Sequence, residues 1–327
     1  MKKNLLRLTL CALLFAIGFP AQAQQQGKVP RIGFLLPTSR SAVAEPLDAF
    51  RGGLRELGYV EGQNIVIEYR SADGNFDRLP HLAADLVHLK VDLIVAGALQ
   101  AIQPAKNATS TIPIVMTGTT DPVLSGLIAN LARPGGNITG LTNGGPELYG
   151  KRLELLKETV PKSSRIAFFL NPTSPSAQLW LNETQASARV LGLRINSFGL
   201  PNANDFERAF QDATKWGADA FTVAGGPEFT TNRKPILRLA VKNRLPGIYP
   251  FREYVEEGGL MSYAPSLSDL YRRAARYVDK ILKGARAAEL PVEQPTRFEF
   301  IINLKAARQI DLVIPANVLA LANKVIR

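Results

Sequence analysis

VDLIVAG at residues 91–97 and IPIVMTG at residues 112–118 are two short runs rich in β-branched and other apolar residues. Amphipathic helical patterns alternate with runs of this kind, for example at 46–57 and 76–89. This alternation is typical of a mostly parallel sheet that is covered by helices on both faces. The two runs therefore predict the α/β class and set the pattern for the rest of the chain.

The same alternation occurs twice along the chain. The predicted strands of the first half are 31–37, 65–70, 91–97, 112–118 and 138–142. Those of the second half are 165–171, 194–199, 220–224 and 246–250, with helices at 176–191, 205–216 and 232–243. The turn formers Asn143-Gly144-Gly145-Pro146 separate the halves. We predict two doubly wound parallel-sheet lobes joined by a hinge, with lobe 1 at 29–143 and lobe 2 at 146–262.

The C-terminal part of the chain adds a strand pattern at 260–264 and a helical pattern at 268–284. We expect this helix to return to the first lobe, which assigns about 265–290 to lobe 1. The segment 295–303 alternates like a last strand, and Pro315 precedes a closing helix predicted at 316–326. The lobe that holds 291–327 is left open.

The first 23 residues form a predicted secretory signal peptide. Lys2, Lys3 and Arg7 make a basic start, residues 8–19 an apolar run, and Ala21-Gln22-Ala23 an A-x-A cleavage site. We expect a periplasmic protein whose mature chain starts at residue 24. Outside this segment the sequence has no apolar stretch of membrane-spanning length.

Composition narrows the classes of function. Cys11 is the only cysteine and lies inside the signal, either as an ordinary residue or, less in keeping with its surroundings, as a lipoprotein cysteine. Removing 23 of the 327 residues leaves about 304, which favours two domains. The formal charge of +11 falls to +8 when the three basic residues of the signal are removed, and no run of five basic residues occurs. A nucleic-acid partner is therefore not expected.

The chain lacks the usual parts of a catalytic or cofactor site. His81 and His88 are the only histidines, and seven positions on one helix separate them by roughly 10 Å. This distance is too long for the two histidines to share one metal without a third element of the fold. Residues 37–40 read PTSR where a dinucleotide fold has its glycine-rich loop, and no phosphate loop of the G-x-x-x-x-G-K-S/T type is present. We predict no catalytic residue, no metal site and no cofactor.

In open α/β sheets, small ligands bind beyond the carboxyl ends of the strands. The candidate ligand-binding residues at those ends are Thr38, Ser39, Ala98, Leu99, Gln100, Thr117, Thr119 and Asp121 in the first lobe, and Asn171, Ser174, Gly226, Tyr249, Glu253 and Tyr263 in the second. Most are neutral hydrogen-bonding groups, aromatic rings or small residues. Such a lining suits binding a small polar molecule rather than transforming it.

Several of these candidates also have structural explanations. Asp121 precedes Pro122, so it either caps a helix or pairs with a ligand ammonium. Asn171 either caps the next helix or helps a helix N-terminus to receive a carboxylate. Tyr249 and Tyr263 either pack in the core or stack on a ligand.

The segment TDPVLSGLIANLARPGGNITG at residues 120–140 resembles the solute-binding proteins of ABC transporters that have the type I periplasmic binding fold. Further matching stretches are 49–96, 111–142, 150–161, 165–172 and 258–307. Within the family, the chain is similar to a branch with members that bind tryptophan-like or tyrosine-like amino acids. The resemblance therefore covers most of the mature chain.

The resemblance implies two lobes with three crossings that close on a ligand and deliver it to a permease in the inner membrane. It places Thr119, Asp121, Asn171, Ser174 and the loop 98–100 near that ligand. This loop reads Ala98-Leu99-Gln100 after Gly97, where relatives commonly have G-T/S-x-A. The loop therefore lacks the hydroxyl that Thr or Ser supplies in relatives. A bulkier or less polar ligand, such as an aromatic acid, is consistent with this difference.

Three hypotheses of function follow. The first is a monomeric extracytoplasmic receptor of an ABC importer that binds an amino acid or an aromatic carboxylate and closes by hinge motion. The second is an exported hydrolase or sugar-modifying enzyme in which Asp121 faces Glu228 or Glu253 across the cleft. The third is a sensory subunit that presents its ligand to a membrane partner.

Overall fold

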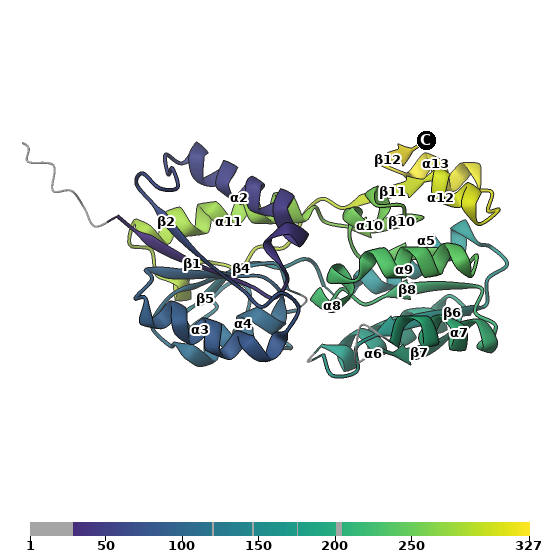
Figure 1. Ribbon diagram of the computed structural model, residues 1–327, viewed down its shortest axis with the longest axis horizontal. Coiled ribbons are helices and arrows are strands. Elements are labelled where there is room, and N and C mark those ends of the chain that lie inside the picture. The colour runs from purple at the N-terminus through teal and green to yellow at the C-terminus, as the bar shows by residue number, and fades with distance from the viewer. Residues whose placement is uncertain (1–28, 120, 146, 175, 201–204) are drawn as a thin grey trace, which may run out of the picture.

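The computed structural model describes residues 29–119, 121–145, 147–174, 176–200 and 205–327. These residues form two α/β lobes that lie side by side, each with its own sheet (Figure 1). The prediction of two parallel-sheet lobes is confirmed. The predicted signal peptide at 1–23 lies outside the described residues.

Lobe 1 contains a five-stranded parallel sheet in the order β2-β1-β3-β4-β5. Its strands are β1 (Arg31–Leu36), β2 (Val66–Ser71), β3 (Leu93–Ala96), β4 (Ile114–Thr117) and β5 (Ile138–Leu141). Its helices are η1 (Arg40–Val43), α2 (Ala44–Glu56), η2 (Phe76–Arg78), α3 (Leu79–His88), α4 (Ala98–Ala108), α11 (Leu267–Leu282) and η4 (Ala287–Glu289).

Alternation along β1 explains why helices cover both faces of this sheet. Ile32 and Phe34 pack into the apolar cluster that contains residues of α2 and α11, while Leu35 packs into the cluster of α3 and α4. The α11 helix lies close against α2 because Gly53 has no side chain. A Cβ there would lie 2.5 Å from the carbonyl oxygen of Arg272. A helix from the C-terminal third of the sequence is thereby part of lobe 1.

Lobe 2 contains a seven-stranded sheet in the order β12-β11-β10-β9-β8-β6-β7. Its strands are β6 (Arg165–Leu170), β7 (Arg194–Gly199), β8 (Ala220–Val223), β9 (Gly247–Tyr249), β10 (Met261–Ala264), β11 (Glu299–Asn303) and β12 (Lys324–Ile326). Its helices are α5 (Glu147–Thr159), α6 (Ala177–Val190), α7 (Phe206–Trp216), α8 (Pro227–Thr231), α9 (Arg233–Lys242), α10 (Arg252–Glu256), α12 (Leu304–Gln309) and α13 (Ala316–Leu321). Only the β10–β11 pair is antiparallel among these strands.

The prediction of one closing helix over 316–326 is wrong. The α13 helix ends at Leu321, and β12 then pairs in parallel with β11. Asn323 anchors this strand, because its side-chain oxygen accepts a hydrogen bond from the backbone N–H of Phe300 and its own N–H donates to the Phe300 carbonyl. The β-branched Val325 and Ile326 suit the strand that follows. The tail that the sequence left unassigned therefore completes the sheet of lobe 2.

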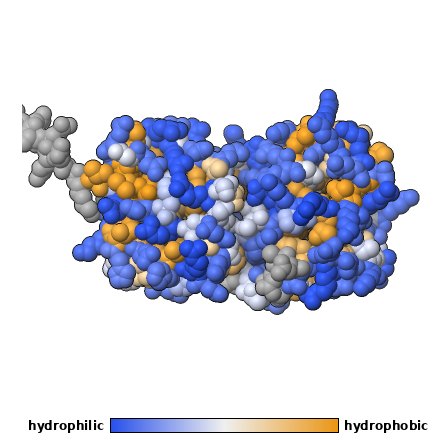
Figure 2. Space-filling model, viewed as in Figure 1, coloured by the Kyte–Doolittle hydropathy of each residue, from blue (hydrophilic) through white to orange (hydrophobic). Residues whose placement is uncertain are grey.

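Three segments connect the lobes in the described chain. They join β5 to α5, β10 to α11, and η4 to β11. Hydrophilic residues cover both lobes on the face shown in Figure 2, with apolar patches on each and residues of intermediate hydropathy between the lobes. No helix of the described residues is both long and apolar enough to cross a bilayer.

Candidate functional site

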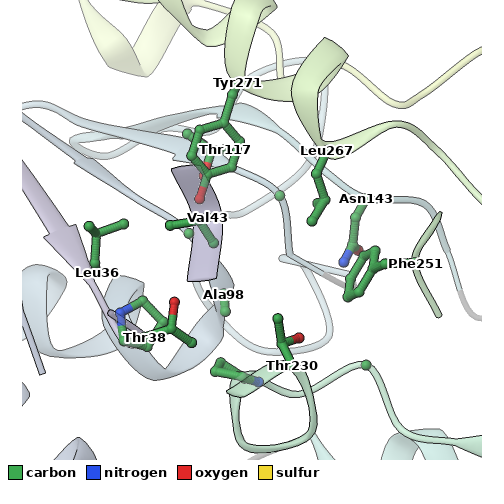
Figure 3. Close-up of a pocket in the computed structure, with 15 residues that line it drawn as sticks. Leu36, Thr38, Val43, Ala98, Thr117, Asn143, Thr230, Phe251, Leu267 and Tyr271 are labelled. Carbon is green, nitrogen blue, oxygen red and sulfur yellow. The ribbon is translucent and has the colours of Figure 1, made fainter. Parts of the chain in front are cut away.

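A cavity lies between the lobes, beyond the carboxyl ends of β1 and β4 in one sheet and of β8 and β9 in the other (Figure 3). Its volume is about 80 Å³. The lining residues are Leu36, Pro37, Thr38, Val43, Gly97, Ala98, Thr117, Gly118, Asn143, Gly225, Pro227, Thr230, Phe251, Leu267 and Tyr271. This is the position at which parallel α/β sheets bind small ligands.

Lobe 1 contributes hydroxyl groups to the cavity wall. Thr38 follows β1, Thr117 ends β4, and Tyr271 reaches from α11 toward Thr117 (Figure 3). Burial raises the pKa of the Tyr271 hydroxyl, so this group stays neutral and can donate or accept a hydrogen bond. Gly97 permits this arrangement, because a Cβ there would lie 2.7 Å from Thr117 Oγ1 and 3.2 Å from the Tyr271 hydroxyl.

Lobe 2 and the first crossing supply the opposite wall. Pro227 and Thr230 belong to the short helix α8, and Phe251 is the N-cap residue of α10. The Phe251 ring and the Asn143 side chain lie side by side at the cavity (Figure 3). The wall therefore combines one aromatic ring with an amide and a hydroxyl.

The lining of this cavity, as far as the chain is described, contains no charged side chain. Glu228 follows Pro227 of the lining, and Glu253 lies two positions after Phe251. The carboxylate oxygens of both are buried without a hydrogen-bond partner among the described residues. Burial raises the pKa of Glu228 to about 7 and raises that of Glu253 as well. Both acids therefore favour their neutral form more than an exposed glutamate does.

A second, smaller void of about 10 Å³ adjoins the cavity. The two voids share Asn143, Gly225 and Phe251 in their walls, and Arg152 of α5 lines only the smaller one. Arg152 is 5% exposed, and its guanidinium lies 5.5 Å from the centre of the Tyr149 ring. Burial lowers the pKa of Arg152 from its usual value, although an arginine remains charged in proteins.

The structure brings some of the predicted site residues together. Thr38, Ala98 and Thr117 line the cavity. Gln100 Nε2 lies 3.3 Å from Ser174 Oγ, a hydrogen bond that joins α4 of lobe 1 to lobe 2. Gln100 and Ser174 therefore meet at the lobe interface.

Three predicted residues stabilise loops near the strand ends. The Ser39 hydroxyl accepts a hydrogen bond from the N–H of Ala42 in η1. Asp121 Oδ1 accepts hydrogen bonds from the N–H groups of Val123 and Leu124, at 3.1 and 3.0 Å. Asn171 Oδ1 accepts from the N–H and the hydroxyl of Thr173.

These contacts stabilise turns and do not cap helices. Residues 122–126 form a turn, and the N-cap residue of α6 is Ser176. The helix-capping alternative is therefore not met for Asp121 or Asn171. Neither residue lines the cavity.

The remaining predicted residues also lie outside the cavity lining. Leu99 packs in the core of α3 and α4, because the α4 face that carries it turns toward the sheet. Tyr249 packs in the core of lobe 2 and stacks on Tyr254 with ring centres 5.0 Å apart. Tyr263 stacks on Phe298. Tyr249 and Tyr263 therefore pack against other rings of lobe 2, which is the first of the two explanations offered for them.

Thr119, Gly226 and Glu253 have other positions. Thr119 is buried, and its carbonyl accepts a hydrogen bond from the N–H of Asn143 at the first crossing. Gly226 caps α8, where a Cβ would lie 2.4 Å from the Glu228 carboxylate. Glu253 lies in the first turn of α10, just after Phe251.

Sequence reasoning missed several lining residues, chiefly Tyr271, Val43, Asn143, Leu267 and Thr230. Tyr271 sits in the second turn of α11, beyond a helix N-terminus capped by the Ser266 hydroxyl. A helix that begins directly after a crossing presents its first turns to the cleft. That topological signal was available, but the apolar spacing of the helix predicted only packing.

The second half of the segment 120–140, which carries the family resemblance, lies at the end of lobe 1 opposite the cavity. Asn137 Nδ2 donates hydrogen bonds to the carbonyls of Thr109 and Ile112, and the N–H of Gly135 donates to the carbonyl of Ala288. These residues precede the amino ends of β4 and β5, opposite the cavity. This half of the segment stabilises the fold.

The described residues contain no group of three or more His, Cys, Asp or Glu side chains that could hold a metal ion. His81 is largely exposed and lies 3.7 Å from Asp85, one turn along α3. The described geometry of His81 thus shows a surface contact.

Comparisons with known proteins agree with this architecture. A curated relative, the tyrosine-binding protein of Clostridioides difficile strain R20291, is 26% identical over 285 residues, which are 87% of this chain and 82% of the relative. An ABC domain from Streptococcus pneumoniae, solved in complex with L-Trp, superimposes with a TM-score of 0.85 at 27% identity, over 91% of this chain and 99% of its own. A conserved domain protein of Vibrio cholerae O1 biovar El Tor gives a TM-score of 0.86 at 28% identity, over 91% and 100% of the two chains.

The model of the family described as ABC transporter substrate binding protein matches residues 31–326. Both described sheets and the cavity between them fall within this range. The chain belongs to the family of ABC transporter substrate-binding proteins.

Proposed function

We propose that this protein is the extracytoplasmic receptor of an ABC importer and that it binds a small organic ligand, an amino acid or an aromatic carboxylate, between its lobes. The cavity at the carboxyl ends of both sheets is the observation that carries the proposal. The family consists of binding proteins, which argues against the hydrolase hypothesis.

The chemistry of the lining supports an aromatic ligand. Phe251 offers a ring face, and Leu36, Val43 and Leu267 offer apolar surface. Thr38, Thr117, Thr230 and the Tyr271 hydroxyl can fix the polar groups of a ligand. The two relatives that bind tyrosine and tryptophan agree with a ligand of this class.

The size of the cavity supports hinge motion as part of binding. Its volume of about 80 Å³ is smaller than the roughly 150 Å³ of an apolar cavity that holds benzene. A ring-containing ligand needs more room than this, and separation of the lobes, with the Gln100–Ser174 hydrogen bond broken, would provide it. In this proposal the bond re-forms, or Gln100 and Ser174 turn to the ligand, when the lobes close on it.

The location and the partner belong to the same proposal. The basic, apolar and A-x-A segments of residues 1–23 support export to the periplasm. The receptor then acts as a monomer that delivers its ligand to a permease in the inner membrane.

Isothermal titration calorimetry tests the ligand class directly. The protein is unfolded and refolded to remove carried-over ligand, and then titrated with L-tyrosine, L-tryptophan and their desamino acids. We expect one of them to bind with one-to-one stoichiometry, and small-angle scattering to show a smaller radius of gyration in its presence. A protein that binds none of them, and whose scattering no solute changes, contradicts the proposal.

A further inference from the structure

Arg152 is a buried cation without an acidic partner. It is 5% exposed, and no Asp or Glu of the described chain lies within 4.0 Å of its guanidinium. The residues outside the described part include no Asp or Glu at all. A buried charge without a counter-ion is strongly unfavourable unless hydrogen bonds or a ligand compensate it.

Two backbone carbonyls compensate Arg152 only in part. Nε donates to the carbonyl of Tyr263 at 2.9 Å, and Nη2 donates to the carbonyl of Pro250 at 3.4 Å. No acceptor for Nη1 is found among the residues that the structure describes. The Tyr149 ring lies beside the guanidinium but supplies no formal negative charge.

The free side of Arg152 borders a void next to the ligand cavity. The void of about 10 Å³ has room for one water-sized group. Its walls include Asn143, Gly225 and Phe251, which also line the main cavity. A carboxylate oxygen is such a water-sized group, while the rest of a ligand would occupy the larger cavity.

We propose that Arg152 forms an anion subsite of the ligand cavity and receives one carboxylate oxygen of the bound ligand. This inference rests on the proposed function and deepens it, because it makes the carboxylate the recognised group. The lining of the main cavity supplies no cation of its own within the described residues. Arg152 is thus placed to set the charge preference of the site.

The test compares an acid with its amide. L-Tyrosine and L-tyrosinamide share the ring and the ammonium and differ in the carboxylate. We expect the wild-type protein to bind L-tyrosine about tenfold or more tightly than L-tyrosinamide, the usual effect of a hydrogen bond to a charged group. The Arg152→Gln variant should lose about 10- to 100-fold in affinity for L-tyrosine and less than about threefold for L-tyrosinamide.

Two further variants separate recognition from support of the fold. Lys151→Gln removes a cation one position away on the same helix, where the side chain is 39% exposed and paired with Glu154. It should leave the preference for the acid unchanged. Arg152→Lys keeps the charge and should restore part of that preference. If Arg152→Gln lowers the affinity for L-tyrosine and for L-tyrosinamide equally, Arg152 only supports the backbone and the proposal is overturned.

Acetate and acetamide provide a second comparison of an acid with its amide, for use if Arg152→Gln does not fold or if no aromatic ligand binds. Acetate at tens of millimolar should raise the melting temperature of the wild-type protein more than acetamide does, and Arg152→Lys should reduce this difference. Failure of tyrosine with success of acetate overturns the aromatic ligand class and keeps the anion subsite. Equal effects of acetate and acetamide overturn the subsite.

Discussion

The two lobes contribute different chemistry to the cavity between them. Lobe 1 places uncharged hydroxyls at the wall, from Thr38, Thr117 and Tyr271. Lobe 2 holds the buried Arg152 and the half-buried Glu228 and Glu253 beside the cavity, and none of the three has an ionic partner within 4.0 Å among the described residues. Under the proposal for Arg152, lobe 1 shapes the site and lobe 2 sets its charge preference.

The apolar cores of the two lobes also differ in composition. Both clusters of lobe 1 are mainly aliphatic. The large cluster of lobe 2 is built on aromatic rings, with Phe221 in contact with Phe169, Phe210 and Tyr249. Both tryptophans, Trp180 and Trp216, lie on helices of lobe 2, so tryptophan fluorescence reports on this lobe.

The largest expected effect comes from the aromatic core of lobe 2. Phe221→Ala removes a fully buried ring and should lower the free energy of unfolding by about 3–5 kcal/mol. Urea denaturation followed by tryptophan fluorescence measures this loss. Phe198→Ala, at a partly buried ring of the same lobe, should cost less. Equal losses would show that the ring cluster is not the main support of this lobe.

A glycine substitution tests the stability of lobe 1 in the same way. Gly140 has a φ of 124°, and a Cβ there would lie 2.4 Å from the carbonyl oxygen of Met116 on the neighbouring strand. Gly140→Ala should cost about 3 kcal/mol through strain and displacement of β5.

Gly136→Ala is the control for that substitution, because a Cβ there meets nothing within 4 Å. It should change stability by less than about 0.5 kcal/mol. Far-UV circular dichroism should register the loss in Gly140→Ala more strongly than tryptophan fluorescence does. A loss seen first by fluorescence would show that strain at Gly140 is transmitted to lobe 2.

Burial of Glu228 predicts how stability depends on pH. Its pKa rises from 4.5 in the unfolded chain to about 7 in the folded protein, so the folded state binds the proton more tightly. The free energy of unfolding should therefore be highest below about pH 4.5 for this group. It should fall by at most about 3 kcal/mol as the pH rises through 7.

Glu228→Gln should flatten this part of the profile, with denaturation midpoints measured between pH 4 and 8. Glu253 contributes a slope of the same sign, because burial raises its pKa too. Asp77→Asn, at an exposed position in lobe 1, is the control and should leave the profile unchanged. A profile that is identical in Glu228→Gln and the wild type would show that Glu228 is solvated or paired in solution.

The smallest effects concern the two walls of the cavity. Phe251→Ala should weaken binding of an aromatic ligand about tenfold, because the ring is lost from the wall of lobe 2. Tyr271→Phe removes one hydroxyl from the wall of lobe 1 and should weaken binding about threefold. Calorimetry with L-tyrosine compares both with Phe76→Ala, a substitution away from the lining. If Tyr271→Phe weakens binding more than Phe251→Ala does, lobe 1 contributes the larger share of recognition.

The sequence predicted the two lobes well because strand and helix periodicities repeat along the chain. It predicted that Thr38 and Thr117 lie close together because parallel strands place their carboxyl ends at one edge of the sheet, and both residues line the cavity. It could not decide between a local backbone contact and ligand binding for Asp121, since both uses need the same residue before a proline. That choice depends on where the carboxylate points.

Other parts of the site depend on contacts between distant segments. Arg152 looks like an ordinary charged position on an amphipathic helix, and only the packing of α5 against β9 and β10 buries it. Tyr271 joins the cavity because α11 crosses back to lobe 1. The strand β12 was missed because its pairing with β11 is set by Asn323 and not by a periodic pattern.

A crystal structure of the protein grown with L-tyrosine tests the central claim most directly. The account predicts density for the ligand between the lobes, with the ring against Phe251 and one carboxylate oxygen within hydrogen-bond distance of Arg152 Nη1. Density elsewhere on the molecule, or a carboxylate that points away from Arg152 in an occupied cavity, would contradict it.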